Sequence, residues 1–212
     1  MTRAGFDFRF GATHCNSFPS SIMSTRNQVI DFQTLRTLAN VDGFYLLGYA
    51  WLFGMSLWIS FFGGVIAFRA LPRHQFGALQ HKVFPVYFVQ SILLSGGLLT
   101  FWVFKHPDVA THAFKPWYAD VAQAYALGTV LVGQGLNYFV VGPMTGRIMF
   151  KRQKQEKEEG KAYNDAGVSA EMKALNRQFG SLHGISSLFN LAAVIALGIH
   201  GLWIGNVGVK GY

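Results

Sequence analysis

Seven polar side chains lie inside long apolar stretches of this 212-residue chain and are the first candidates for chemistry. An unpaired polar group in hydrocarbon is costly, so such residues mark binding or transport sites unless they hydrogen bond to a neighbouring helix. None of them is charged, which disfavours a proton-coupled pump and a channel lined by fixed charges. Hydrogen bonding between helices is the structural alternative. The residues are Gln90, Thr100, Gln123, Gln134, Asn137, Asn190 and His200.

Soft metal ions are one class of ligand that the sequence could hold. The thioethers of Met144 and Met149 suit Cu(I), with His200 as a further ligand, although methionine is also an ordinary packing residue. Four-helix membrane bundles often hold haem b between two facing histidines, but His183 lies 17 residues before His200, about 25 Å along one helix. We therefore predict no haem and no other cofactor, and keep a binder or transporter of a soft metal such as copper as an alternative.

The sequence carries no catalytic signature that names a reaction. Ser181 and Ser186 lie near His183, but an acyl-transfer triad also needs an orienting acid, and none is nearby. Phosphate-binding, dinucleotide-binding and zinc-protease motifs are absent as well. We therefore predict a protein that is not an enzyme, with an interfacial enzyme site at His183 as an alternative.

Four uncharged apolar stretches must position these residues: 44–68, 83–104, 121–144 and 185–205. Each has 21 to 25 residues, and roughly 20 helical residues cross the core of a bilayer. The composition agrees, since 51% of the residues are hydrophobic and only 13% are charged. The sequence therefore predicts an all-α integral membrane four-helix bundle.

The segments between and around the spans have distinct compositions. Residues 1–43 are predicted to form a poorly ordered leader with a weakly amphipathic turn at 30–40, and Met23 is an alternative start. Residues 69–82 read as a short basic loop, and residues 206–212 as a tail.

The connection at 145–183 is the one sizeable soluble segment. Its charged first half, Arg147–Lys161, is expected to extend the third helix, helped by Arg152/Glu156 and Lys154/Glu158 pairs. A new helix is expected to start at Ser169.

Charge predicts the partners and the orientation. The formal charge of +8 arises largely from loops next to spans, which favours anionic lipid headgroups over nucleic acid. The first and third connections are richest in Lys and Arg, so the positive-inside rule places them in the cytosol. A homo-oligomer or another membrane protein is a further possible partner.

Several separated motifs resemble the eukaryotic transmembrane protein 205 family over about residues 44–205. The first is FRALPRHQFG at 68–77, with Gln80, Lys82 and Pro85; the second is HGISSL at 183–188, with Asn176, Phe179 and Asn190; between them lie Asn137, Pro143, Thr145 and Met149. The resemblance implies a small four-span protein with no established enzymatic reaction. It also implies an association with platinum-drug resistance and vesicular or secretory traffic, and a distant similarity to bacterial copper-resistance membrane proteins.

We expect one polar cluster at the cytosolic mouth of the bundle, with helix capping and headgroup contacts as the alternative role. His183 and Asn190 lie seven residues apart on one helix face, with Asn137 and Gln134 as partners across the bundle. The preferred function is membrane transport or trafficking in a eukaryotic endomembrane or the plasma membrane; a mitochondrial membrane is the weaker alternative. The cluster comprises Arg69, Arg73, Gln80, Lys82, Asn137, Thr145, Asn176, His183 and Asn190.

Overall fold

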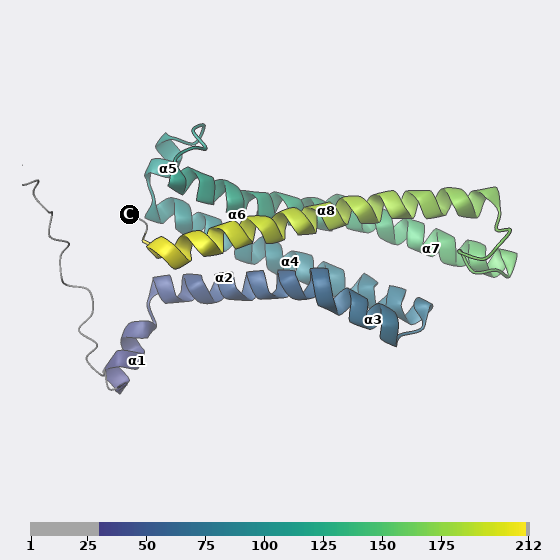
Figure 1. The fold of residues 1–212 in the computed structure, drawn as a ribbon, viewed down its shortest axis with the longest axis horizontal. Coiled ribbons are helices and arrows are strands. Elements are labelled where there is room, and N and C mark those ends of the chain that lie inside the picture. Colours follow the sequence, from purple (N-terminus) through teal and green to yellow (C-terminus); the bar gives the residue numbers. More distant parts are fainter. Residues whose placement is uncertain (1–29, 211–212) are drawn as a thin grey trace, which may run out of the picture. The chain divides into compact units, whose positions relative to one another are not determined.

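The computed structural model describes residues 30–210 of the chain. Within that range it contains helices and no strand, which confirms the predicted all-α class. Four helical rods run side by side (Figure 1). They are Val41–Ala70 (α2 Val41–Leu57, η1 Trp58–Gly63, α3 Gly64–Ala70), α4 Arg73–Lys105, Ala119–Glu159 (α6 Ala119–Leu136, η2 Asn137–Val141, α7 Gly142–Glu159) and α8 Ala170–Val207, with a short α5 at Asp108–Thr111.

All four rods are long and apolar enough to cross a membrane, as predicted. The helix α6 packs against both α4 and α8, and α2 packs against α4 and α8. Their shared core buries Leu52, Trp102, Leu127 and Leu197 completely. Many other large apolar side chains remain exposed, among them Leu93, which is 69% exposed. Apolar side chains both in the core and on the surface are expected of a helical bundle that is surrounded by lipid.

The predicted loop at 69–82 is wrong for most of its length. Only Leu71 and Pro72 separate α3 from α4, and α4 already begins at Arg73. Leu71 is extended, with φ −114° and ψ 144°, because a residue before proline is pushed away from the helical region. The first turns of α4 are thus a polar extension of the second span, as α7 is of the third.

The last part of the predicted leader, residues 30–43, can be compared with the structure. Residues 1–29 lie outside the described range, but α1 forms at Phe32–Leu38 within the predicted amphipathic segment. The Asp31 carboxylate caps α1 by accepting hydrogen bonds from the Thr34 N–H at 2.7 Å and hydroxyl at 2.8 Å. The next helix, α2, starts at Val41 behind an Asn40 cap, so the first span begins before residue 44.

The connection between α7 and α8 follows the prediction in outline. The third helix extends through Glu159 and ends at Gly160, which has a left-handed φ of 64°. Ser169 starts α8 by accepting a hydrogen bond from the Met172 N–H, as expected of an N-cap. Figure 1 shows that α7 and α8 project beyond the α3–α4 turn. We call this end of the bundle, with its two connections, the loop end.

A π-helical turn, η2, interrupts the third rod directly before Pro143. Pro143 has no N–H, and its ring would clash with a carbonyl four residues earlier in a regular α-helix. The chain widens to a π turn instead, in which the Gly142 N–H bonds to the Asn137 carbonyl. A Cβ on residue 142 would lie 2.6 Å from that carbonyl oxygen, so only glycine fits here.

Substituting Gly142 with alanine is expected to destabilise the bundle by about 1–3 kcal/mol, because the new methyl group overpacks the π turn. The matched control is Gly135→Ala, where a Cβ meets nothing within 4 Å and alanine should stabilise the helix by about 0.5–1 kcal/mol. Thermal melting in detergent measures both. Equal melting midpoints for the two variants would show that the π turn does not require glycine.

Candidate functional site

A cavity of about 580 Å³ lies near the loop end between α4, the η2–α7 segment and α8. We call it the aromatic cavity because its walls carry Phe84, Phe88 and Tyr138 among other rings. Phe84 and Phe88 are stacked, with ring centroids 5.5 Å apart. No Asp, Glu, Lys or Arg is among its lining residues within the described chain. Of the predicted cluster, the structure places Gln80, Asn137, Thr145, His183 and Asn190 on its walls.

Asn137 is the polar centre of the aromatic cavity. It opens the π turn, is fully buried, and donates through Nδ2 to Asn190 Oδ1 at 3.2 Å and to the Ser186 carbonyl at 3.3 Å. The predicted contact between Asn137 and Asn190 is therefore confirmed. The other predicted partner, Gln134, is wrong, since neither of its side-chain amide atoms has a hydrogen-bond partner. The Asn137 Oδ1 atom is also unpaired.

His183 stands at the rim of the aromatic cavity. Its ring stacks on Phe179 at a centroid distance of 5.9 Å, and its carbonyl accepts a hydrogen bond from the Ser187 hydroxyl. Within the described residues, no carboxylate forms a hydrogen bond or ion pair with His183. A triad in which an acid orients His183 is thus not assembled.

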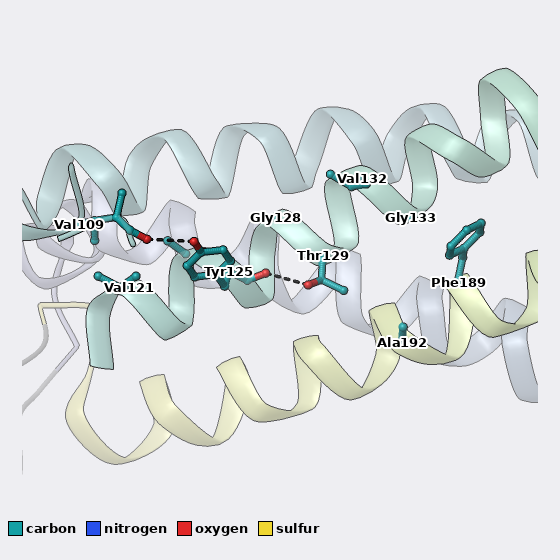
Figure 2. Close-up of a pocket in the computed structure, with 11 residues that line it drawn as sticks. Val109, Val121, Tyr125, Gly128, Thr129, Val132, Gly133, Phe189 and Ala192 are labelled. Carbon is teal, nitrogen blue, oxygen red and sulfur yellow. Dashed lines mark hydrogen bonds between the residues drawn. The ribbon is translucent and has the colours of Figure 1, made fainter. Parts of the chain in front are cut away.

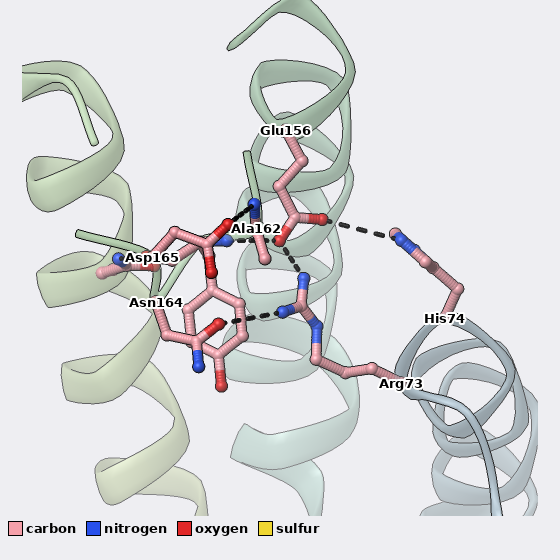
Figure 3. Close-up of polar contacts among 8 residues, drawn as sticks. Arg73, His74, Glu156, Ala162, Asn164 and Asp165 are labelled. Carbon is pink, nitrogen blue, oxygen red and sulfur yellow. Dashed lines mark hydrogen bonds and ion pairs between the residues drawn. The ribbon is translucent and has the colours of Figure 1, made fainter. Parts of the chain in front are cut away.

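A second group of polar residues lies beside this cavity, and Figure 3 shows the part of it around Arg73, Glu156 and Asn164. We call it the Arg73–Glu156 cluster, and it comprises Arg73, Arg152, Glu156, Tyr163 and Asn164. Arg73 at the start of α4 forms an ion pair with Glu156 of α7, and its Nη1 donates to Asn164 Oδ1 at 3.5 Å. Glu156 also accepts a hydrogen bond from the Tyr163 N–H at 2.8 Å. The carboxylate of Glu156 therefore joins α4, α7 and the α7–α8 loop.

Tyr163 is held between two guanidinium groups in the same cluster. The guanidinium carbons of Arg73 and Arg152 lie 4.0 and 4.2 Å from its ring centroid, a cation–π geometry. Arg152 also lies 4.5 Å from the Phe179 ring. The predicted Arg152/Glu156 pair is wrong because Arg73 occupies Glu156 and Arg152 turns to the aromatic rings. The predicted Lys154/Glu158 pair is confirmed at 3.6 Å.

The predicted cluster is thus divided between two neighbouring places. Arg73 lies in the Arg73–Glu156 cluster, and Asn176 is attached to it by donating to the Tyr163 carbonyl at 2.8 Å. Arg69 and Lys82 are exposed and line neither place. Glu156 and Tyr163 were missed by the sequence reasoning, because their partner Arg73 is distant along the chain. In a charge-rich helix, the local sequence does not show which acidic residue is buried.

The opposite end of the bundle contains another buried polar group around His200. His200 is fully buried, with Nε2 2.6 Å from the Tyr45 hydroxyl and Nδ1 2.9 Å from Gln123 Oε1. Both ring nitrogens are occupied, so the histidine is satisfied without a metal ion. Met144 and Met149 are at the other end and line different cavities. The structure does not bring these three predicted soft-metal ligands together.

A further cavity, drawn in Figure 2, is almost entirely apolar. It lies between α6 and α8, with Val121, Val132 and Phe189 among its lining residues. Its two hydroxyls are already used: Tyr125 donates to the Ala113 carbonyl at 2.9 Å, and Thr129 donates to the Tyr125 carbonyl at 2.9 Å. The lining offers no free polar group for recognition, so this surface is suited to lipid chains.

Replacing Asn190 with leucine is expected to lower the stability of the bundle by about 0.6–2 kcal/mol, because Asn137 loses its partner on α8. Insertion should persist, since leucine favours the membrane. Asn206→Leu is the control, because the one side-chain hydrogen bond of Asn206 within residues 30–210 is to the Leu202 carbonyl of its own helix. Melting in detergent compares them. A melting midpoint of Asn190→Leu at or above that of wild type would show that the contact between Asn137 and Asn190 does not stabilise the bundle.

Replacing Glu156 with alanine is expected to release the α7–α8 loop, because Arg73 and the Tyr163 N–H lose their shared acceptor. A hydrogen bond to a charged group contributes about 1.5–3 kcal/mol, so tryptic cleavage after Lys161 should accelerate roughly tenfold or more. The control is Glu158→Ala, whose carboxylate pairs, among the residues that the structure describes, with the exposed Lys154 alone. Similar cleavage rates in the two variants would contradict the role of Glu156.

Comparison with known proteins extends the resemblance seen in the motifs. Residues 47–154 match the family described as "Domain of unknown function (DUF4149)". Transmembrane protein 205 of Danio rerio is 27% identical over 202 residues, which cover 88% of this chain and 99% of that protein. Xanthocillin biosynthesis cluster protein D of Aspergillus fumigatus is 33% identical over 94 residues, which cover 44% of this chain and 58% of that protein. No solved structure matches. With its four membrane-spanning rods, the chain belongs to the DUF4149 family and is a multi-pass membrane protein similar to transmembrane protein 205.

Proposed function

We propose that this chain is a non-enzymatic membrane transporter that binds a neutral, amphipathic small molecule in the aromatic cavity. The observation that supports this most is the unpaired Oδ1 of Asn137, a buried acceptor beside a cavity of about 580 Å³. An unpaired buried polar atom costs free energy unless a partner arrives. The Oδ1 atom itself is closed to solvent, so the Asn137 side chain must turn toward the cavity before a ligand hydroxyl or N–H can donate to it and remove that cost.

The lining of the cavity defines the chemical class of the ligand. Phenylalanine and tyrosine rings favour a flat apolar body, while Asn137, Thr145 and Asn190 provide polar groups on one side. The lining holds no Asp, Glu, Lys or Arg that could balance a ligand charge in this low-dielectric place. A volume of this size accommodates a drug-sized molecule. A neutral aromatic compound with one hydrogen-bond donor matches the volume, the aromatic walls and the polar groups of the cavity.

The position of the Arg73–Glu156 cluster supports a route by which the ligand moves between the aromatic cavity and water. Phe76, Gly77, Met149 and Phe179 line both the aromatic cavity and the smaller hollow at this cluster. The cluster therefore stands next to the cavity and joins the segments that would separate if the cavity opened. We propose that its ion pair and cation–π contacts hold the closed state.

The comparisons are consistent with a small organic cargo in a eukaryotic membrane. One relative is named as a protein of a xanthocillin biosynthesis cluster, and both relatives come from eukaryotes. We place transport ahead of vesicular or secretory trafficking because the cavity provides a ligand site, whereas trafficking requires a partner surface. We propose an endomembrane or the plasma membrane as the location.

The binding test uses a neutral aryl diazirine that carries a benzyl alcohol, on the full chain in lipid nanodiscs. Photolabelling should fall on peptides of α4, α7 and α8 that line the aromatic cavity. The variant Ser187→Phe places a ring in the cavity and should reduce labelling there at least fivefold. Leu188→Phe is the control, because Leu188 is 65% exposed and does not line the cavity.

Two results would contradict the proposal. Labelling spread evenly over the lipid-facing helices would show partition into the bilayer without a site. Uptake of the same compound into proteoliposomes should exceed that of protein-free vesicles and fall in Ser187→Phe. Site-specific labelling without faster uptake would leave a binding protein and overturn transport.

A further inference from the structure

A second ligand site is indicated by a groove of about 840 Å³ between α7 and α8 at the loop end. We call it the basic groove. Four cations line it: Arg147, Lys151 and Lys154 from α7, and Arg177 from α8. The three on α7 are spaced by four and three residues, so they occupy one face of the helix. Arg177 faces them from the neighbouring helix.

The cations of the basic groove are largely uncompensated. No carboxylate lines the groove, and only Lys154 has an ion pair, at 3.6 Å to Glu158. That pair is exposed, with side chains 78% and 55% accessible, so it is weak. Among the described residues, Arg147, Lys151 and Arg177 form no ion pair. Two nearby acids are engaged elsewhere, Glu156 by Arg73 and Glu159 by Ser169.

Apolar side chains line the same groove. Met144, Ile148 and Leu182 line it next to the cations. Met144 is the last residue of the third uncharged stretch, and Arg147 is the first charge after it. Met144 and Lys154 are ten residues apart, about 15 Å along the helix axis. The lining is thus apolar at Met144, within the uncharged stretch, and cationic at Lys154, beyond its end.

We propose that the basic groove binds one anionic phospholipid, with its phosphate at Arg147, Lys151 and Arg177. The acyl chains lie against Met144, Ile148 and Leu182. Arginine donates pairs of hydrogen bonds that match phosphate oxygens, and the Ser181 hydroxyl adds a further donor. A soluble phosphate would use the cations but leave the apolar side exposed. The combination of both surfaces selects a lipid.

Native mass spectrometry of the full chain in detergent tests this site with dioleoyl phosphatidylglycerol and dioleoyl phosphatidylcholine. Wild type should retain one phosphatidylglycerol in preference to phosphatidylcholine. Each lost cation should weaken retention roughly fivefold, so Arg147→Gln/Arg177→Gln should weaken it about 25-fold. The control is Arg69→Gln/Lys82→Gln, which removes the same charge outside the groove and should change retention little.

Two further measurements distinguish a phospholipid from free phosphate as the bound anion. Dihexanoyl phosphatidylglycerol should bind more weakly than the dioleoyl lipid, and millimolar inorganic phosphate should not displace the latter. Equal retention of the two headgroups, an equal effect of the control variant, or full displacement by phosphate would each overturn the proposal. Melting of both variants should match wild type, because all four substituted side chains are exposed.

Discussion

Hydrogen bonding of the backbone inside lipid is the constraint on which the rest of this structure depends. A bilayer core offers no water to free N–H and C=O groups, so each of the four rods must satisfy its own backbone. The chain meets this constraint even where its sequence opposes a regular helix. At Pro143 it widens into η2 rather than breaking, and the Gly142 N–H reaches the Asn137 carbonyl. The same turn places Asn137 opposite Asn190, and so the polar centre of the aromatic cavity follows from a backbone requirement.

Polar side chains gather at the two ends of the bundle and use different chemistry there. At one end His200, Tyr45 and Gln123 form a closed set in which both imidazole nitrogens are occupied. At the loop end Asn137 keeps an unpaired oxygen, and Arg147, Lys151 and Arg177 have no anionic partner in the described chain. A satisfied network stabilises one arrangement, whereas unpaired groups leave interactions for a ligand. Both proposed binding sites rely on such unpaired groups at the loop end.

The length of the four uncharged stretches was enough to predict the spans, because any helix that crosses a bilayer core must be long and apolar. The contact of Asn137 with Asn190 could also be predicted, since few polar groups in an apolar bundle leave few possible pairs. The helical start of α4 could not, because Arg73 to Lys82 reads as a basic loop and its contacts with α7, among them the Arg73–Glu156 ion pair, come from residues distant along the chain. The Arg73–Glu156 cluster was missed for another reason. Glu156 has a basic neighbour one turn away in Arg152, and nothing local shows that aromatic rings take that arginine instead.

The π turn η2 determines how the following helix, α7, is rotated about its own axis. A π turn accommodates one residue more than an α turn, and one residue corresponds to about 100° of rotation around a helix axis. The face of α7 that meets α4 is therefore set by η2 as well as by its own sequence. Glu156 meets Arg73, and Arg147 turns toward α8, only with this extra residue in place. Loss of one residue between 137 and 141 would rotate the whole extension, so the length of this short segment is under stronger constraint than the identity of its apolar side chains.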